Sequence, residues 1–210
     1  MCVAIIKTKG NRITRKELTQ AWDCNPDGAG VAWAEQGKLK VIKSFNADGS
    51  MMESKAFIDK LVKLQTKFIN HNMIIHFRIA TQGYGLDGLP NVENCHPFAI
   101  HKDVVFAHNG IISDMPDSNL ISDTRFFNRL ILRKLPFKFE IGNSALRTMI
   151  ENSIGSSKFV FLNSSGEYDI ANEAFGVWKG GNWFSNQMHC RMAQRFSFRN
   201  QTTIFNESEV

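Results

Sequence analysis

Cys2 combines two groups that a hydrolytic enzyme needs, because it directly follows the initiator methionine. A side chain as small as cysteine permits removal of Met1, which would leave the Cys2 thiol beside a free α-amine. An α-amine has an unperturbed pKa of roughly 7.7–8.0, so near neutral pH it can act as a base. A nucleophile and its general base would then belong to one residue. The structural alternative is a small apolar side chain at the start of a buried strand, the usual role of a free cysteine.

Two charged residues lie beside apolar segments and could bind the two ends of an amino acid. Arg78 lies at the end of a predicted strand that opens with the apolar residues 73–75, and a guanidinium can hold a carboxylate through two parallel N–H bonds. Asp123 lies in Ser122-Asp123-Thr124, ahead of an apolar helical segment, and could hold a substrate ammonium group. The structural alternatives are a salt-bridge partner at the end of a strand for Arg78 and a helix N-cap for residues 122–124.

The pair Asn109-Gly110 follows the apolar residues 104–106 and could supply the two N–H donors of an oxyanion hole. An Asn-Gly pair at a strand end is also a common turn. A thiol with an oxyanion hole attacks an acyl carbon, and a guanidinium with a carboxylate complements the head group of a free α-amino acid. If these residues converge in space, their chemistry indicates an amino acid with a side-chain acyl group, such as glutamine or asparagine.

The elements that must position these residues read as one α/β unit without repeats. Apolar runs and helical spacing predict strands over residues 2–7, 31–34, 39–45, 73–77, 104–107, 158–162 and 175–178, and helices over 14–23, 53–69, 122–134 and 144–154. Thr14 and Glu17 form a predicted capping box, and Gln36-Gly37 a predicted turn. Clustered strands and paired helices indicate antiparallel sheets covered by helices rather than a doubly wound sheet. No glycine-rich segment matches a nucleotide-binding motif.

Composition and charge exclude several other classes of protein. The chain has 210 residues, a hydrophobic fraction of 43% and a net charge of +5, which is ordinary for a soluble globular protein. It contains neither an apolar stretch approaching the ~20 residues of a membrane span nor a signal peptide, so we expect a cytoplasmic protein with no membrane partner. The four cysteines are widely separated and predict reduced thiols, with no disulfide framework and no metal site.

Residues 191–199 interleave arginine with phenylalanine near the end of the chain. Such a pattern can bind single-stranded nucleic acid through base stacking and phosphate contacts. It also fits a late strand or a docking tail, which is the interpretation we favour over a nucleic-acid partner.

Six motifs in this order resemble those of the class II glutamine amidotransferases, which are N-terminal-nucleophile hydrolases. The motifs are Cys2 after the initiator, Asn25-x-Asp27-Gly28-x-Gly30, His76-x-Arg78-x-x-Thr81-x-Gly83, Asn94-x-His96-Pro97, His108-Asn109-Gly110 and Ser122-Asp123-Thr124. The resemblance is clear from residue 2 to about residue 125 and loose through residues 178–183. It implies a family domain over residues 1–185, followed by a tail or last strand over residues 186–210.

The resemblance also implies a fold and a set of roles. The fold is α+β, a four-layer αββα sandwich of two antiparallel sheets covered by helices. Cys2 would form a γ-glutamyl thioester with its α-amine as base, and Asn109 and Gly110 would form the oxyanion hole. The substrate glutamine would be bound by Arg78 at its carboxylate, by Asp123 at its ammonium group, and by Thr81 in support of the carboxylate pocket. His96 would help to shape the active-site loop. Neither a cofactor nor a metal is implied.

Two departures from the family bear on how glutamine binding is gated. The large synthases carry an arginine before the Asp-x-x-Gly stretch, where this chain reads Cys24-Asn25-Pro26-Asp27, and a histidine where it has Gln82. The chain ends where fused members begin a synthase domain, so we expect the ammonia acceptor on a separate subunit. The alternatives are hydrolysis of another γ-glutamyl amide, and a non-catalytic binding subunit that uses the basic aromatic tail.

Overall fold

The structure, a computed structural model, describes residues 2–80, 88–136 and 139–187, and this part of the chain forms two antiparallel sheets flanked by helices. The first sheet, in the order β3-β2-β4-β1-β10-β9, contains β1 (Val3–Lys7), β2 (Ala29–Glu35), β3 (Lys38–Lys43), β4 (Met73–Phe77), β9 (Val177–Lys179) and β10 (Asn182–Phe184). The second, in the order β5-β6-β7-β8, contains β5 (Phe98–His101), β6 (Val104–Asn109), β7 (Lys158–Asn163) and β8 (Tyr168–Ala171). The helices are α1 (Arg15–Cys24), α2 (Ser54–Lys67), α3 (Asp123–Leu130) and α4 (Ser144–Ile154), with short 3-10 helices η1 (Val92–Asn94), η2 (Leu132–Lys134) and η3 (Glu173–Phe175). None of the helices in these ranges is long and apolar enough to cross a membrane.

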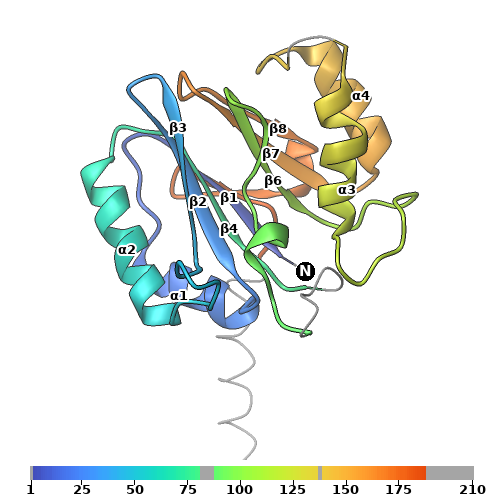
Figure 1. The fold of residues 1–210 in the computed structure, drawn as a ribbon. Helices are drawn as coiled ribbons and strands as arrows, with labels where there is room; N and C mark the ends of the chain where they lie inside the picture. The colour runs from blue at the N-terminus through green and yellow to red at the C-terminus, as the bar shows by residue number, and fades with distance from the viewer. Residues whose placement is uncertain (1, 81–87, 137–138, 188–210) are drawn as a thin grey trace, which may run out of the picture.

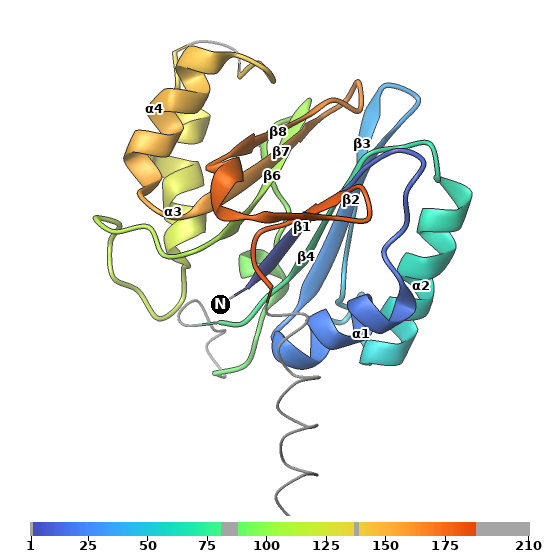
Figure 2. The same ribbon diagram turned by 180° about the vertical axis from the view of Figure 1, so that it is seen from behind.

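The two sheets face each other, and each has its helices on the outer side (Figure 1, and from behind in Figure 2). Side chains alternate along β1 because successive residues of a strand point to opposite faces. Val3 and Ile5 therefore pack toward α1 and α2, whereas Ala4 and Ile6 pack against the second sheet. A third apolar core lies between the second sheet and the helices α3 and α4. The predicted four-layer αββα sandwich is thereby confirmed.

Local signals place several of these elements correctly. The capping box at the start of α1 is present, because the Thr14 hydroxyl accepts from the Glu17 amide and the Glu17 carboxylate accepts from the Thr14 amide. The turn between β2 and β3 falls at Gln36-Gly37, where both residues have positive φ angles, +51° and +71°. That backbone matches the twist of a two-residue hairpin.

Other elements differ from the sequence-based expectation. The pattern does not predict β5, β8 or β10, which have only three or four residues each. The last expected strand, over residues 175–178, begins at Val177 because Phe175 belongs to η3. The helix expected over 122–134 divides into α3 and η2. Strand β6 runs two residues further than expected, so His108 and Asn109 pair with β7 instead of forming a turn.

Lys7 is a fully buried cation at the end of β1. Its ammonium group donates to the carbonyl oxygens of Phe68, Ile69 and His71, at 3.3, 2.6 and 2.9 Å. These carbonyls follow the C-terminal end of α2, where a positive charge is favourable. Burial, together with the charge of Arg12, lowers the pKa of Lys7 to about 8, so the ammonium form still predominates at pH 7.

Replacing Lys7 by methionine is expected to lower the free energy of unfolding at pH 7 by about 1–3 kcal/mol, because three carbonyl oxygens lose a hydrogen bond from a charged donor. Urea denaturation followed by circular dichroism measures the change. Lys9→Met is the matched control, since Lys9 is exposed two residues further along the chain and its substitution should leave the midpoint in place. Equal midpoints for the two variants would contradict a stabilising role of the Lys7 ammonium.

Candidate active site

A small cavity opens at the N-terminal end of β1, and several of the candidate residues lie in its wall. Cys2, Arg78, His96, Gly110 and Asp123 line it, together with neighbouring residues of the same segments. Larger hollows exist elsewhere, including one of about 790 Å³ beside β5, but its lining contains no cysteine, serine or threonine within the described residues. We therefore locate the site by its chemistry and not by its volume.

The Cys2 thiol lies against the backbone of the segment that follows β4. Its Sγ is 3.4 Å from both the carbonyl oxygen and the amide nitrogen of Ile79, so the thiol donates to one and accepts from the other. Burial raises the pKa of the Cys2 thiol, although the Ile79 amide and the charge of Arg78 oppose the increase. The thiol therefore keeps its proton at neutral pH and needs a base before it can attack as thiolate.

Arg78 is held at the end of β4 by the loop that precedes β2. The Arg78 amide donates to the Gly28 carbonyl at 2.7 Å, and the Asp27 amide donates to the Arg78 carbonyl at 2.9 Å. The Asp27 carboxylate accepts from the Ala80 amide at 2.8 Å. The motif Asn25-x-Asp27-Gly28 thus fixes the backbone on either side of Arg78, whose side chain is only 3% exposed. Thr81 and Gln82 lie outside the described residues.

Three histidines meet at the cavity: His96 and His108 belong to its wall, and His76 packs against the His96 ring. The His96 ring lies 4.1 Å from that of His76 and 6.4 Å from that of His108, centroid to centroid. His76 Nε2 lies 3.0 Å from the His108 carbonyl oxygen, and His108 Nδ1 lies 2.7 Å from the Thr124 hydroxyl. Burial lowers the pKa of His76 to about 3 and that of His108 to about 4, and it holds the pKa of His96 well below its ordinary value. All three are therefore neutral at pH 7.

The segment of His96 approaches β2 at Gly30 so closely that a side chain there would not fit. A Cβ on Gly30 would lie 2.9 Å from Pro97 Cδ and 3.0 Å from the His96 carbonyl carbon. Gly30 ends the motif Asn25-x-Asp27-Gly28-x-Gly30, so the close approach supplies a physical reason for its last residue. His96 is almost fully buried, with 4% of its surface exposed. Within the described ranges, neither of its ring nitrogens has a hydrogen-bond partner.

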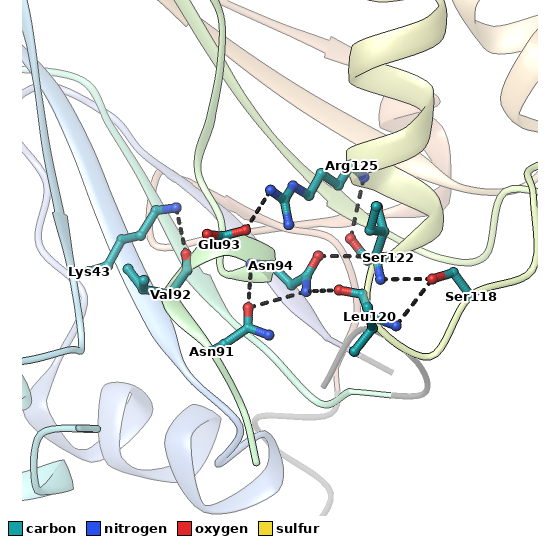
Figure 3. Close-up of polar contacts among 10 residues, drawn as sticks. Lys43, Asn91, Val92, Glu93, Asn94, Ser118, Leu120, Ser122 and Arg125 are labelled. Carbon is teal, nitrogen blue, oxygen red and sulfur yellow. Dashed lines mark hydrogen bonds and ion pairs between the residues drawn. The ribbon is translucent and has the colours of Figure 1, made fainter. Parts of the chain in front are cut away.

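Asn94 joins the segment before His96 to the loop before Asp123, as Figure 3 shows. Its side-chain nitrogen Nδ2 donates to the Leu120 carbonyl at 2.7 Å and to the Asn91 side-chain oxygen at 3.1 Å. Its side-chain oxygen accepts from the Ser122 amide at 3.0 Å. Asn94 is fully buried, and the ion pair between Glu93 and Arg125 spans the same two segments at 2.5 Å. Motif Asn94-x-His96-Pro97 is therefore placed relative to α3 by a side-chain amide.

Asp123 is the first residue of α3, and Ser122 is its N-cap, as one reading of the motif predicted. The Ser122 hydroxyl accepts from the Arg125 amide at 3.3 Å. One oxygen of the Asp123 carboxylate accepts from the Ile112 amide at 2.8 Å, and the other from the Thr124 amide at 2.6 Å. Asp123 thus connects α3 to the segment that follows Gly110. An ammonium-binding role for it stays a prediction.

Asn109 and Gly110 differ in their placement. Asn109 ends β6, is fully buried and is not part of the cavity wall. Its side-chain nitrogen Nδ2 donates to the Ser185 hydroxyl at 2.6 Å, while its side-chain oxygen has no partner within the described residues. Gly110 lines the cavity with φ +147°. A Cβ there would lie 2.7 Å from Ser157 Cβ and 2.8 Å from its Cα, so the close approach requires glycine.

Gly110→Ala is expected to lower the turnover of an acyl substrate in this cavity by about 10²-fold or more, because the loop must move away from Ser157 and the backbone N–H of residue 110 moves with it. Steady-state kinetics would measure the loss. Gly37→Ala is the control, since φ is +71° there but nothing lies within 4 Å of an added Cβ. The Gly37→Ala variant has the strain of a positive φ angle but no steric clash, so each folded molecule should keep normal turnover. A fully active Gly110→Ala protein would rule out an oxyanion role for the Gly110 amide.

Sequence reasoning missed the residues that support the site. Asp27 and Asn94 stood in the quoted motifs without a role, and their types as hydrogen-bonding side chains beside glycine or histidine were the available signal. Ser185 and Asn186 carried no signal, because they contact Ala4 and Cys2 from the other end of the chain. Among the residues that the structure describes, no group of three or more His, Cys, Asp or Glu is placed to hold a metal ion.

The fold and the site define a class of protein: an αββα sandwich with a cysteine at the start of a central strand. A sequence model of the family "Glutamine amidotransferases class-II" matches residues 13–127, more than half of the chain. The chain therefore belongs to the class II glutamine amidotransferases.

Individual relatives match over parts of their length. A Haemophilus influenzae protein named "Putative glutamine amidotransferase" is 28% identical over 166 residues, 71% of this chain and 52% of that protein. A Schizosaccharomyces pombe protein named "Probable glutamine–fructose-6-phosphate aminotransferase (isomerizing)" is 36% identical over 66 residues, 30% of this chain and 9% of that protein. The solved structure of glutamine phosphoribosylpyrophosphate amidotransferase from B. subtilis, complexed with ADP and GMP, aligns with 88% of this chain and 41% of its own, with 18% identity and a TM-score of 0.49. The chain thus spans about half or less of the length of these relatives.

Proposed function

We propose that this chain hydrolyses glutamine to glutamate and ammonia through a thioester on Cys2, after removal of Met1. The observation that carries the proposal is the presence of Cys2, Arg78, Gly110 and Asp123 in the wall of one cavity. Membership of the class II glutamine amidotransferases supports the choice of glutamine as substrate.

The first step is attack of Cys2 Sγ on the side-chain carbonyl carbon of glutamine. A sulfur–carbon bond forms, the carbonyl electron pair moves to oxygen, and the thiol proton moves to the Cys2 α-amine. The raised pKa of the Cys2 thiol supports the need for that base, since little thiolate is present at neutral pH. His96 and His108 line the cavity and His76 contacts them, but all three rings are neutral at pH 7, and the mechanism assigns them no proton transfer.

The tetrahedral intermediate carries a negative oxygen that needs donors already in place. The Gly110 amide and the Asn109 side chain fill this role in the proposal. When the intermediate collapses, the carbon–nitrogen bond breaks and the proton on the α-amine passes to the departing nitrogen, which leaves as ammonia. Water then attacks the thioester, the sulfur–carbon bond breaks, and glutamate is released with a free Cys2 thiol.

The amino-acid head group is assigned to two charged side chains of the cavity wall. Arg78 binds the α-carboxylate, for which a guanidinium is the better match than an ammonium because it offers parallel donors. Asp123 binds the α-ammonium group, and the fixed backbone on either side of Arg78 supports the clamp. Thr81 in the carboxylate pocket and His96 in the active-site loop keep their predicted roles.

The test is an assay of the purified chain with L-glutamine, together with its intact mass. We expect glutamate and ammonia in equal amounts and a mass that lacks Met1. Asparagine and a set of γ-glutamyl amides serve as competing substrates, and faster turnover of one of the γ-glutamyl amides would replace glutamine in the proposal. A chain that retains Met1 and still hydrolyses glutamine would overturn the role of the α-amine.

The residues of the cavity do not indicate which molecule accepts the ammonia. An acceptor on a separate polypeptide and a cytoplasmic location both stay predictions. The basic aromatic residues 191–199, which the binding-subunit alternative invokes, lie outside the described residues. That alternative predicts no release of glutamate. Glutamate release in the same assay would therefore exclude it, and an inactive chain would favour it.

A further inference from the structure

The segment directly after β10 reaches β1 through the side chain of Ser185. The Ser185 amide donates to the Ala4 carbonyl at 2.9 Å, which continues the pairing of β10 with β1 by one residue. In return, the Ala4 amide donates to the Ser185 hydroxyl at 2.9 Å instead of to a backbone carbonyl. Ser185 is fully buried, so its hydroxyl replaces a missing backbone acceptor at this strand end.

The same arrangement occurs once more on the first sheet, between Ser44 and Ala29. The Ser44 amide donates to the Ala29 carbonyl at 2.8 Å, and the Ala29 amide donates to the Ser44 hydroxyl at 2.7 Å. Ser44 is also fully buried. The two serines therefore make equivalent structural contacts, and any contact that only one of them makes is a separate feature.

Ser185 differs from Ser44 because its hydroxyl accepts a second hydrogen bond, from the side-chain amide of Asn109 at 2.6 Å. A hydroxyl oxygen has two lone pairs, and at Ser185 both are used, one by β1 and one by Asn109. The next residue continues the link, since the Asn186 side-chain amide donates to the Cys2 carbonyl at 2.7 Å. Residues 185–186 thus contact both the strand that begins after Cys2 and the amide at the end of β6.

We propose that Ser185 is a positioning residue for the oxyanion hole, an inference that rests on the proposed glutamine hydrolysis. A carboxamide has two N–H groups, and the Ser185 hydroxyl binds one of them. This bond fixes the plane of the Asn109 carboxamide and occupies only one of its N–H groups. Asn109 lies directly before Gly110, which lines the cavity, and in the proposal the second N–H is the one that meets the developing oxyanion. Because the same hydroxyl binds the Ala4 amide, the position of Asn109 is set relative to the strand that carries the nucleophile.

The test compares Ser185→Ala with Ser44→Ala in the glutamine assay. Both variants lose the acceptor of one strand-end amide, so we expect similar decreases in melting temperature. Only Ser185→Ala frees the Asn109 amide, and its kcat should fall about 10-fold or more, with KM for glutamine little changed, because the donor is lost in the transition state. Ser185→Cys, similar in volume but a weak acceptor, is the second variant should Ser185→Ala not fold.

A double-mutant cycle separates positioning from a general structural effect. In the Asn109→Ala background, Ser185→Ala should cause no further decrease in kcat, because the group that it positions is already absent. Additive decreases, or equal kcat for Ser185→Ala and Ser44→Ala, would overturn the inference. A wild-type chain that releases no glutamate from glutamine would instead overturn the proposed function, so the two failures are distinguishable.

Discussion

Cys2→Ala is expected to lower kcat for glutamine hydrolysis by at least about 10⁴-fold, because residues that act as one catalytic unit fail together when the nucleophile is removed. Alanine at position 2 leaves the α-amine, the cavity and the strand β1 in place. The variant should therefore fold as the wild type does and still bind glutamine. Glutamate release measured by a coupled assay, with binding measured by calorimetry, separates the loss of chemistry from a loss of affinity.

Cys24→Ala is the matched control, since Cys24 is another partly buried cysteine outside any disulfide and is the last residue of α1. Burial raises the pKa of its thiol, as it does for Cys2, and the charge of Asp23 adds to the increase. Turnover should be normal in Cys24→Ala. Retained activity in Cys2→Ala, or equal losses in both variants, would show that another group performs the attack.

The residue types of the site were predictable from sequence because each belongs to a local motif. Cys2 follows Met1, and Arg78 directly follows an apolar strand that the pattern places correctly. The capping box at Thr14 was predictable for the same reason, since all its bonds lie within one helical turn. Signals of this kind need no knowledge of the fold.

Contacts between distant segments could not be predicted in this way. Strand β10 has three residues and pairs with β1, which lies at the other end of the chain, so no periodic pattern marks it. Gly110 has to be glycine because of Ser157, and Asn109 is oriented by Ser185. The sequence could therefore suggest an oxyanion pair, while the reason for its geometry lies in partners 47 and 76 residues away along the chain.

The buried histidines make stability strongly dependent on pH, and we expect the protein to unfold in mild acid. The folded state lowers the pKa of His76 from its ordinary 6.5 to about 3, so below pH 6.5 the unfolded chain binds more protons than the folded one. The stabilisation is complete above pH 6.5 and is lost as the pH falls toward 3. Between pH 7 and pH 4, His76 alone accounts for about 3 kcal/mol of the free energy of unfolding.

His108 and His96 act in the same direction, because burial lowers the pKa of each. A domain of ordinary stability has about 5–15 kcal/mol in total, so three such groups together can exhaust it. Urea denaturation at a series of pH values between 7 and 4 measures the effect. The slope of the free energy of unfolding against pH should be roughly 1 kcal/mol per pH unit for each buried histidine near pH 5.5.

His76→Gln tests whether the slope comes from the buried rings. Glutamine has no titrating group and can still place an amide nitrogen near the His108 carbonyl, which His76 Nε2 approaches at 3.0 Å. The variant should lose one histidine's share of the slope, whatever its stability at pH 7. His101→Gln is the control, since His101 is exposed and its replacement should leave the slope unchanged. A free energy of unfolding that stays constant between pH 7 and pH 4.5 would contradict the burial of neutral histidines at the cavity.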